Sequence, residues 1–229
     1  MKISIIIPVY NEEKTIGLLL DYLYKIINKT TIEEIIVVDG KSLDATKNSI
    51  QSYKDVIYLP SEKGRAIQMN TAAKAAKGSV LYFLHCDSFP PLNFDLQIIN
   101  QVQNQNFSGC FKMKFDSNHL VLKISQWFTK FNFKACRGGD QSLFITKELF
   151  TTLNGFNENY TIYEDNELIA RIYKNSKFVV IQDFIVTSSR KYKQNGYWKL
   201  QYHFFVIHLM NRLGFNENKL LIYYKKNVH

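Results

Sequence analysis

Hydrophobic residues follow two different spacings over the first 90 positions of the chain. Short, uninterrupted apolar runs are typical of buried parallel strands, whereas apolar residues that recur every three or four positions indicate helices. Strands are expected at residues 3–9, 35–39, 56–59 and 79–84, and helices at residues 12–27, 44–53 and 65–77. This alternation predicts an α/β fold with a right-handed, doubly wound and mostly parallel sheet flanked by helices.

The pattern is less regular after residue 90. Strands are expected at residues 108–115, 142–146 and 178–187, and helices at residues 119–133, 164–175 and 195–213. The alternating residues 108–115 are expected to lie across the sheet. The last helix carries an aromatic and aliphatic stripe, formed by Trp198, Tyr202, Phe205, Leu209 and Leu213. Since no repeat, low-complexity segment or Pro/Gly-rich linker interrupts the chain, a single domain is expected.

Polar residues follow the apolar runs at the points where strands are expected to end. Asn11 and Glu12 follow the first strand, Asp39 ends the second, and His85-Cys86-Asp87 follows the fourth. The carboxyl ends of parallel strands meet at one edge of a sheet, where α/β proteins bind ligands. With the acidic pair Glu164-Asp165 further along, this layout predicts an enzyme with a nucleotide-diphosphate site and a general base opposite it.

Several of these residues also suit ordinary structural roles. Asn11 and Glu12 fit the N-terminus of a helix, Asp39 fits a turn, and residues 138–141 fit a loop. The basic residues 188–193 suit a solvated loop, or else their arginine closes over the diphosphate. The residues alone leave both kinds of role open.

Phosphate and metal binding are expected at the same edge. Arg65 follows a glycine at the expected N-terminus of a helix, a position that attracts phosphate. Asp87 suits a hard divalent ion, Mg²⁺ or Mn²⁺, that bridges a diphosphate and neutralises the charge of the leaving group. His85 is a second ligand, a phosphate donor or a structural residue, and Mn²⁺ tolerates imidazole better than Mg²⁺ does.

Charge and cysteine content narrow the class of protein. The 29 Lys and Arg residues exceed the 20 Asp and Glu residues, and the net charge of +9 favours anionic partners. Nucleic acid is not expected, because the lysines are dispersed and no recognised binding module is present. Three cysteines without CxxC spacing fit a reducing cytosol, and no apolar stretch approaches the roughly 20 residues of a spanning helix. A cytoplasmic protein, soluble or peripheral at the inner face of the membrane, is therefore expected.

In this order, the polar segments resemble the motifs of family 2 glycosyltransferases, which have the GT-A fold. Residues 5–13 look like the opening motif of that family. Residues 37–46 resemble its second motif, VVDDGSxDxT, although Gly40 and Lys41 replace the second Asp and the Gly. The triplet His85-Cys86-Asp87 stands where the family carries Asp-x-Asp, so that only the last Asp is kept.

Further segments are similar to a small bacterial subgroup that has a His-x-Asp triplet and is named for its association with selenium-domain or arsenosugar gene sets. These segments are residues 64–70, 83–87, 139–141, 164–168 and 187–190. The resemblance extends over residues 3–215, nearly the whole chain. It implies a single glycosyltransferase domain over residues 1–229, with a nucleotide-binding half at 1–90, an acceptor-binding and catalytic half at 91–190, and a C-terminal helical extension at 191–229.

The resemblance also implies roles for individual residues in a hexosyltransferase-like enzyme. The donor, a UDP-sugar by default, would be bound by Pro8, Tyr10, Asn11, Glu12, Asp39, Arg65, Asn70 and Arg190. The acceptor would be bound by Gly139, Asp140 and Gln141, and the Mn²⁺ or Mg²⁺ ion by Asp87 and His85. Asp165, with Glu164 beside it, would deprotonate the acceptor hydroxyl, which then attacks the anomeric carbon and inverts its configuration.

Two other functions stay open, and so does the placement of the C-terminal helix. A nucleotidyltransferase would carry a Gly-rich loop with Arg and a downstream Lys after the first strand, where this chain has Pro8-Val9-Tyr10-Asn11. A non-catalytic sugar- or nucleotide-binding protein of the same fold is favoured by the missing first Asp of the triplet. The aromatic residues of the C-terminal helix either lie on a membrane, near a lipid-linked acceptor, or pack on the domain or in a homodimer.

Overall fold

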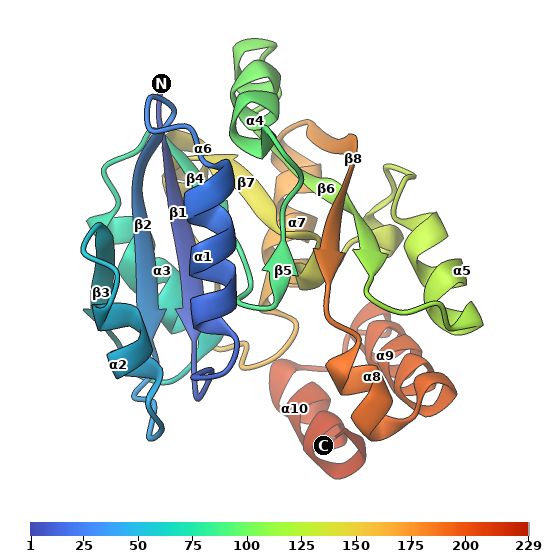
Figure 1. The fold of residues 1–229 in the computed structure, drawn as a ribbon. Helices are drawn as coiled ribbons and strands as arrows, with labels where there is room; N and C mark the ends of the chain where they lie inside the picture. The colour runs from blue at the N-terminus through green and yellow to red at the C-terminus, as the bar shows by residue number, and fades with distance from the viewer. Residues whose placement is uncertain (229) are drawn as a thin grey trace.

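The computed structural model describes residues 1–228, which form one eight-stranded sheet with helices on both faces (Figure 1). The strands are β1 (Ile3–Val9), β2 (Ile32–Asp39), β3 (Val56–Pro60), β4 (Val80–Phe83), β5 (Ser88–Phe89), β6 (Ser108–Phe115), β7 (Leu143–Thr146) and β8 (Phe178–Thr187). The helices are α1 (Ile16–Ile26), α2 (Thr46–Gln51), α3 (Arg65–Ala75), α4 (Phe94–Gln103), α5 (Leu120–Phe128), α6 (Lys147–Thr152), α7 (Glu164–Asn175), α8 (Arg190–Asn195), α9 (Tyr197–Arg212) and α10 (Glu217–Asn227). Two 3-10 turns, η1 (Lys134–Cys136) and η2 (Gly139–Gln141), precede β7. In the part of the chain that the structure describes, no helix has the length and apolar character needed to cross a membrane.

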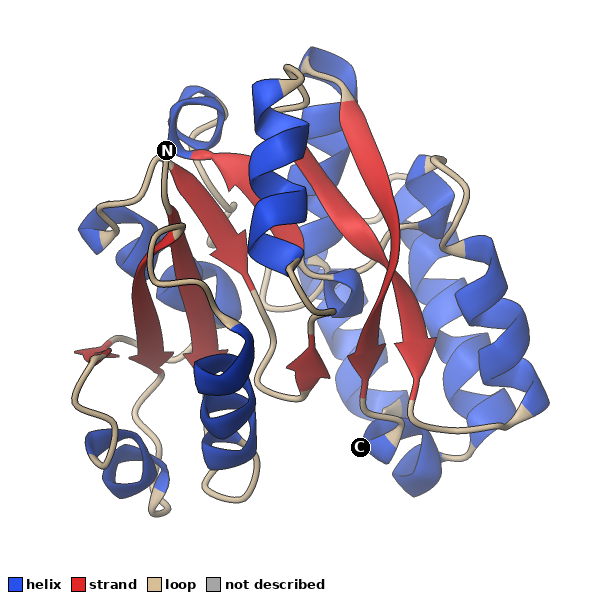
Figure 2. Ribbon diagram, turned by 45° about the horizontal axis from the view of Figure 1, so that its top comes forward, coloured by secondary structure: helices blue, strands red, loops and turns tan. Residues whose placement is uncertain are grey.

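Strands β3, β2, β1 and β4 are parallel neighbours, which confirms the arrangement expected for the first half (Figure 2). Because successive side chains of a strand point to opposite faces, Ile5 and Ile7 of β1 pack in one cluster with Leu20 of α1, whereas Ile6 packs with Met69 of α3. All five side chains are fully buried, and each contributes about 1.5–3 kcal/mol to stability. The carboxyl ends of these strands therefore lie along one edge, at the bottom of Figure 1.

Strand β7 reverses the direction of the sheet. It pairs antiparallel with β4, and Leu143 at its start lies opposite Phe83 at the end of β4. Since β7 begins where β4 ends, turn η2 is placed beside the residues that follow β4. The reversed strand thus brings Asp140 to the edge that carries the ends of β1, β2 and β4.

Residues 108–115 form a strand with the predicted bounds, but the prediction that it lies across the sheet is wrong. They form β6, which pairs antiparallel with β7 and parallel with β8. Gly109 permits this pairing, because a Cβ atom at that position would collide with the backbone of Val179 in β8. Beyond β8, the short strand β5 pairs antiparallel with its end, and Ser88 lies opposite Thr187.

Two helices are shorter than predicted where local hydrogen bonds offer an alternative. The helix expected at residues 12–27 begins at Ile16, because the four residues before it form a turn. The helix expected at residues 119–133 ends at Phe128, where the hydroxyl of Thr129 donates to a carbonyl of the last turn at 2.6 Å. Side-chain hydroxyls that bond the backbone in this way compete with continuation of a helix.

Candidate active site

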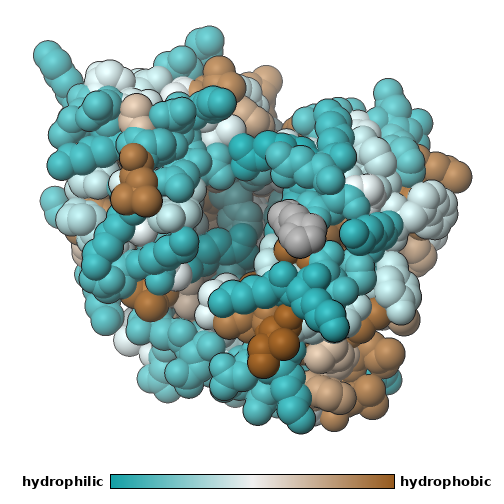
Figure 3. All heavy atoms as spheres, turned by 90° about the horizontal axis from the view of Figure 1, so that it is seen from below, coloured by the Kyte–Doolittle hydropathy of each residue, from teal (hydrophilic) through white to brown (hydrophobic). Residues whose placement is uncertain are grey.

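A hydrophilic hollow opens at the carboxyl end of the sheet, between the two halves of the molecule (Figure 3). The loops at this edge follow β1, β2, β4 and β8, precede β7, and lead into α7. These loops carry most of the residues that the sequence predicts for donor, acceptor and metal binding.

Asp39 is fixed at the end of β2 by three hydrogen bonds. Its carboxylate accepts from the hydroxyl and the N–H of Ser42, at 2.6 and 3.0 Å, and from the hydroxyl of Tyr58 at 2.8 Å. Burial and the hydrogen bond to Asp39 raise the pKa of Tyr58 to about 12, so the phenol stays protonated and remains a donor. The orientation of the Asp39 carboxylate is therefore set before any ligand arrives.

Gln68 joins the ends of β1 and β2 beneath Asp39. Its side-chain amide donates to the carbonyls of Val9 and Val38, at 2.8 and 2.9 Å. Gly40 accommodates this amide, because a Cβ atom there would lie 3.0 Å from the Gln68 side chain. Gln68 lies in the resembling segment 64–70, but no role was predicted for it, and Tyr58 was missed; the spacing of these residues from Asp39 carries no local signal.

The loop after β1 is held against the loop after β2. Asn11, whose φ is 54°, accepts from the N–H of Leu43 at 2.8 Å, and the N–H of Glu12 donates to Thr46 at 2.8 Å. The predicted role of Asn11 and Glu12 at a helix start is wrong, because α1 begins only at Ile16; these residues join the two loops instead. Tyr10 is half-buried, with the ammonium group of Lys63 at 3.7 Å from its ring centroid.

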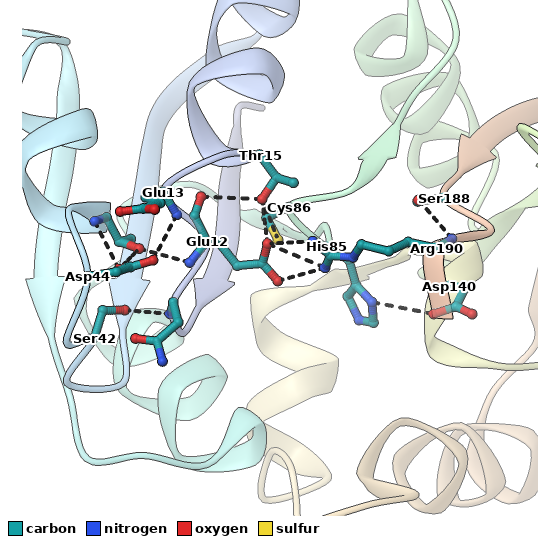
Figure 4. A network of polar contacts seen from close by, with 12 residues as sticks. Glu12, Glu13, Thr15, Ser42, Asp44, His85, Cys86, Asp140, Ser188 and Arg190 are labelled. Carbon is teal, nitrogen blue, oxygen red and sulfur yellow. Dashed lines mark hydrogen bonds and ion pairs between the residues drawn. The ribbon is translucent and has the colours of Figure 1, made fainter. Parts of the chain in front are cut away.

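Glu12 also forms an ion pair with Arg190 from the far half of the chain (Figure 4). The Arg190 guanidinium lies 3.1 Å from the Glu12 carboxylate, and this hydrogen bond raises the pKa of Arg190. The predicted donor residues Glu12 and Arg190 are thus brought together, and they meet at the edge of the sheet beside Asp87, whose negative charge also acts on Arg190.

The acidic pair at the start of α7 faces Arg65. The guanidinium contacts the carboxylate of Glu164 at 2.5 Å and that of Asp165 at 3.2 Å. Both acids are buried, with Glu164 completely inaccessible. Burial and the adjacent charge of Glu164 raise the pKa of Asp165 to about 6, despite the opposing effect of Arg65. Asp165 is therefore ionised at neutral pH and more basic than an ordinary carboxylate.

His85 lies between two carboxylates. Its Nδ1 is 3.6 Å from Asp140, a contact drawn as a dashed line in Figure 4, and its Nε2 is 3.9 Å from Asp165. Burial and Arg65 would lower the pKa of His85, but the contacts with Asp140 and Asp165 raise it. Burial would raise the pKa of Asp140, yet His85 holds it below its usual value. The two carboxylates thus shift the imidazole toward its charged form, and His85 lies between the predicted acceptor residue Asp140 and the predicted base Asp165.

Asp87 differs from its neighbours because its carboxylate makes no hydrogen bond or ion pair with residues 1–228. Its carbonyl accepts from the N–H of Ser188 at 3.2 Å, a consequence of the pairing of β5 with β8. Burial raises the pKa of the Asp87 side chain. Within the described residues, no three His, Cys, Asp or Glu side chains converge in a way that could hold a metal. Asp87 therefore fits a metal that takes its other ligands from phosphate oxygens and water, as Mg²⁺ commonly does.

Two predicted site residues use their side chains elsewhere. The amide of Asn70 donates to the carbonyl of Phe156 and to Glu158, at 2.9 and 2.8 Å, and so holds the loop before α7. Gln141 is buried, and its amide bonds Cys110 and the carbonyl of Cys136. Pro8 lies within β1 in register with β2, while Gly139 and Asp140 lie in turn η2.

Comparison with known proteins agrees with this arrangement. The family described as Glycosyl transferase family 2 matches residues 4–152, and that described as N-terminal domain of galactosyltransferase matches residues 118–193. A poly(ribitol-phosphate) beta-glucosyltransferase of Bacillus spizizenii is 37% identical over 99 residues, which cover 39% of this chain and 15% of that protein. The chain thus spans about a seventh of the length of this relative.

Solved structures share the fold. Residues 1–349 of Staphylococcus aureus TarS, in complex with UDP, superpose with a TM-score of 0.70 and 23% identity, over 82% of this chain and 60% of that one. The mannosyltransferase PcManGT of Pyrobaculum calidifontis, in complex with GDP-Man and Mn²⁺, gives a TM-score of 0.73 and 17% identity, over 93% and 64% of the two chains. The architecture is therefore that of GT-A glycosyltransferases. Because the first family match covers more than half of the chain, the protein belongs to glycosyl transferase family 2.

Proposed function

We propose that this protein transfers a sugar from a nucleotide diphosphate to an acceptor hydroxyl, with inversion at the anomeric carbon. The observation that carries the proposal is the setting of Asp165: a buried carboxylate with a pKa of about 6, between Arg65 and His85 at the edge of the sheet. A carboxylate of this basicity is ionised at neutral pH and suits a general base.

Asp165 acts on the acceptor. It accepts the proton of the hydroxyl while the hydroxyl oxygen forms a bond to the anomeric carbon. The bond from that carbon to the phosphate oxygen breaks, and the nucleotide diphosphate leaves with the electron pair. Because attack and departure occur on opposite faces of the sugar, a single displacement inverts the configuration. Asp140, exposed in turn η2 and held by His85, is in a position to bind an acceptor hydroxyl.

The donor is assigned to the ends of β1, β2 and β4. Asp39 presents a fixed carboxylate to a base N–H or a ribose hydroxyl. UDP is the proposed carrier; TarS was solved with UDP, which supports the choice, whereas the mannosyltransferase was solved with GDP-Man. Arg190 is proposed to bind the diphosphate by exchanging part of its contact with Glu12 for phosphate oxygens.

A divalent ion is assigned to Asp87, whose carboxylate has no competing partner among residues 1–228. When bound, Mn²⁺ or Mg²⁺ would neutralise charge on the departing diphosphate. The mannosyltransferase with the same fold was solved with Mn²⁺, which supports the use of a metal. The nitrogens of His85 face Asp140 and Asp165, so we assign His85 to the support of those carboxylates and Asp87 to the metal.

The test is a thermal-shift panel of nucleotides and nucleotide sugars with Mn²⁺, Mg²⁺ or EDTA, on the wild type, Asp87→Ala and the surface control Asp55→Ala. A ligand at a hundred times its Kd stabilises the fold by about 2.7 kcal/mol. Metal-dependent stabilisation by one nucleotide diphosphate, lost in Asp87→Ala and kept in Asp55→Ala, is expected. Donor turnover is then measured by release of the nucleotide diphosphate, with candidate acceptors. Binding without turnover under any condition would favour a non-catalytic protein, and no binding would overturn the donor site.

A further inference from the structure

Several segments of the chain hold no acidic residue, residues 63–86 and 96–115 among them. Two others include exposed helices. They are residues 117–139, which include α5, and residues 184–216, which include α8 and α9. Together they carry nine Lys and Arg residues, so the other 20 Lys and Arg residues balance the 20 Asp and Glu residues of the chain. The two segments together thus carry a charge of +9, equal to the net charge of the chain, and the charges of the other residues sum to zero.

The same segments hold most of the exposed hydrophobic surface. Of the 21 large hydrophobic side chains that are exposed among residues 1–228, twelve lie in them. Trp127 of α5 is 52% exposed, and Trp198 and Phe205 of α9 are 67% and 63% exposed. On each helix the exposed apolar residues recur every three or four positions, so each presents an apolar stripe to solvent.

Helices α5 and α9 lie side by side. The hydroxyl of Ser125 donates to Gln201 at 3.1 Å, and the rings of His119 and Tyr197 stack with centroids 3.8 Å apart. Hydrophobic side chains gather at the lower right of Figure 3, on the α9 side of the hollow. We call the exposed faces of the two helices the α5–α9 surface; its largest side chains are Trp127, Phe128, Trp198, Tyr202 and Phe205.

Lysines are interleaved with these rings. Lys112, Lys123 and Lys130 line one shallow groove with Trp127 and Phe184. The ammonium group of Lys130 lies 4.1 Å from the ring centroid of Trp127, and that of Lys112 lies 4.1 Å from the ring centroid of Phe184. A lysine held over a ring keeps its charge and its donors, so the groove offers several cations to an anionic group.

We propose that the α5–α9 surface binds an anionic lipid bilayer, with the aromatic rings at the level of the headgroups and the lysines against the phosphates. Aromatic side chains favour the interface between membrane and water, and each lysine near an anionic membrane adds to the attraction. The absence of carboxylates from both segments removes the repulsion that anionic headgroups would meet. A second copy of the chain fits this surface less well, because it would set two excesses of positive charge against each other.

Fluorescence tests the proposal directly, because Trp127 and Trp198 are the two tryptophans of the chain and both lie on this surface. Vesicles of phosphatidylcholine with 30% phosphatidylglycerol, at low salt, are expected to shift the emission to shorter wavelength. Brominated acyl chains are expected to quench it, in Trp127→Phe and in Trp198→Phe alike. Pure phosphatidylcholine and high salt are expected to abolish both effects, since salt screens the attraction.

Absence of a shift, of quenching and of co-sedimentation with the anionic vesicles would overturn the proposal. A blue shift that needs no vesicles and grows with protein concentration would assign the surface to a second copy instead, and would overturn it equally.

A matched pair of charge variants locates the contact. Lys130→Gln with Lys199→Gln removes two exposed charges from the surface, whereas Lys29→Gln with Lys54→Gln removes two exposed charges elsewhere. The first pair is expected to weaken partition into anionic vesicles about thirtyfold, and the second to leave it nearly unchanged. Equal weakening by both pairs would show that net charge alone drives binding and would overturn the assignment to α5 and α9. Thermal melting of all variants confirms that they are folded, and no step of this test depends on the proposed transferase activity.

Discussion

Arg65 and Glu164 form an ion pair at 2.5 Å, although they stand 99 positions apart in the chain. Arg65 is the first residue of α3 and Glu164 the first residue of α7, so the pair links the two halves of the molecule. Glu164 is completely buried, and its second oxygen has no hydrogen-bond partner among residues 1–228. This carboxylate therefore depends on Arg65 for compensation of its charge.

Arg65→Ala is expected to lower the free energy of unfolding, because it leaves the buried charge of Glu164 without its partner. Loss of one member of a buried pair costs about 3–5 kcal/mol, and the partial exposure of Arg65 reduces the expected loss to about 2 kcal/mol. Urea unfolding measures it. Adding Glu164→Gln should restore part of the loss, and Arg212→Ala on the surface serves as the control. A double variant no more stable than Arg65→Ala would refute the dependence.

The proposed transferase should lose activity at acid pH, because Asp165, the proposed base, must be ionised. With the pKa of Asp165 at about 6, kcat/KM is expected to be flat above that pH and to fall tenfold per unit below it. Asp165→Asn should reduce turnover by about a hundredfold to ten-thousandfold and leave donor affinity unchanged, while Asp55→Asn retains both. A full rate in Asp165→Asn would remove this residue from the mechanism.

The raised pKa of Asp165 also makes the stability of the protein depend on pH. A carboxylate whose pKa is about 6 in the folded state and about 3.9 in the unfolded chain binds its proton more tightly when the protein is folded. Its ionisation therefore costs stability as the pH rises from about 4 through about 6. Asp165→Asn should then be more stable than the wild type at pH 7.5, and this advantage should shrink toward pH 4. Thermal denaturation across this range decides it; an advantage independent of pH would contradict the linkage.

Asp39→Ala should weaken binding of the nucleotide. A hydrogen bond to a charged group is worth about 1.5–3 kcal/mol, so the Kd is expected to rise about ten- to hundredfold. Calorimetric titration with UDP measures the change, and Glu33→Ala, which removes a carboxylate of the surface pair with Lys2, is the matched control. Tyr58→Phe removes the hydrogen bond that orients the Asp39 carboxylate but keeps the carboxylate itself, so it should raise the Kd less than Asp39→Ala does. Equal affinity in Asp39→Ala and the wild type would place the base elsewhere.

The elements that were predicted well are those whose pattern is local. The continuous apolar runs of β1 and β2 and the periodic apolar residues of α7 need no distant partner to be recognised. Helices α4 and α10 were not predicted, although five of the ten residues of α4 and five of the 11 residues of α10 are hydrophobic; in α10 all five stand in one continuous run at residues 220–224, which lacks helical spacing. Strand β5 has only two residues and is defined by its pairing with β8. Two residues are too few for a sequence pattern that would predict a strand.

In the candidate site, too, the features with a local sequence signal were predicted and those that depend on long-range contacts were not. That carboxylates stand at strand ends follows from the apolar runs before them, which is how Asp39 and Asp87 were recognised. Their partners could not be predicted, since the contact of His85 with Asp140 depends on the reversal of β7, a long-range pairing. For Gln141 the residue type was misleading. An amide suits an acceptor site, but packing turns this side chain inward, where it bonds Cys110.

One sheet runs without interruption under both halves, from β3 at one edge to β5 at the other. Rotation of one half against the other would break the ladder between β4 and β7, so the molecule has no hinge at that boundary. The separation between Asp39 and Asp165 is thus a property of the folded backbone. With the roles proposed for these two residues, the entropy of aligning donor and acceptor sites is lost once, during folding, rather than at every turnover. In the proposed reaction, any closure over the substrates therefore falls to side chains and to the loops at the sheet edge.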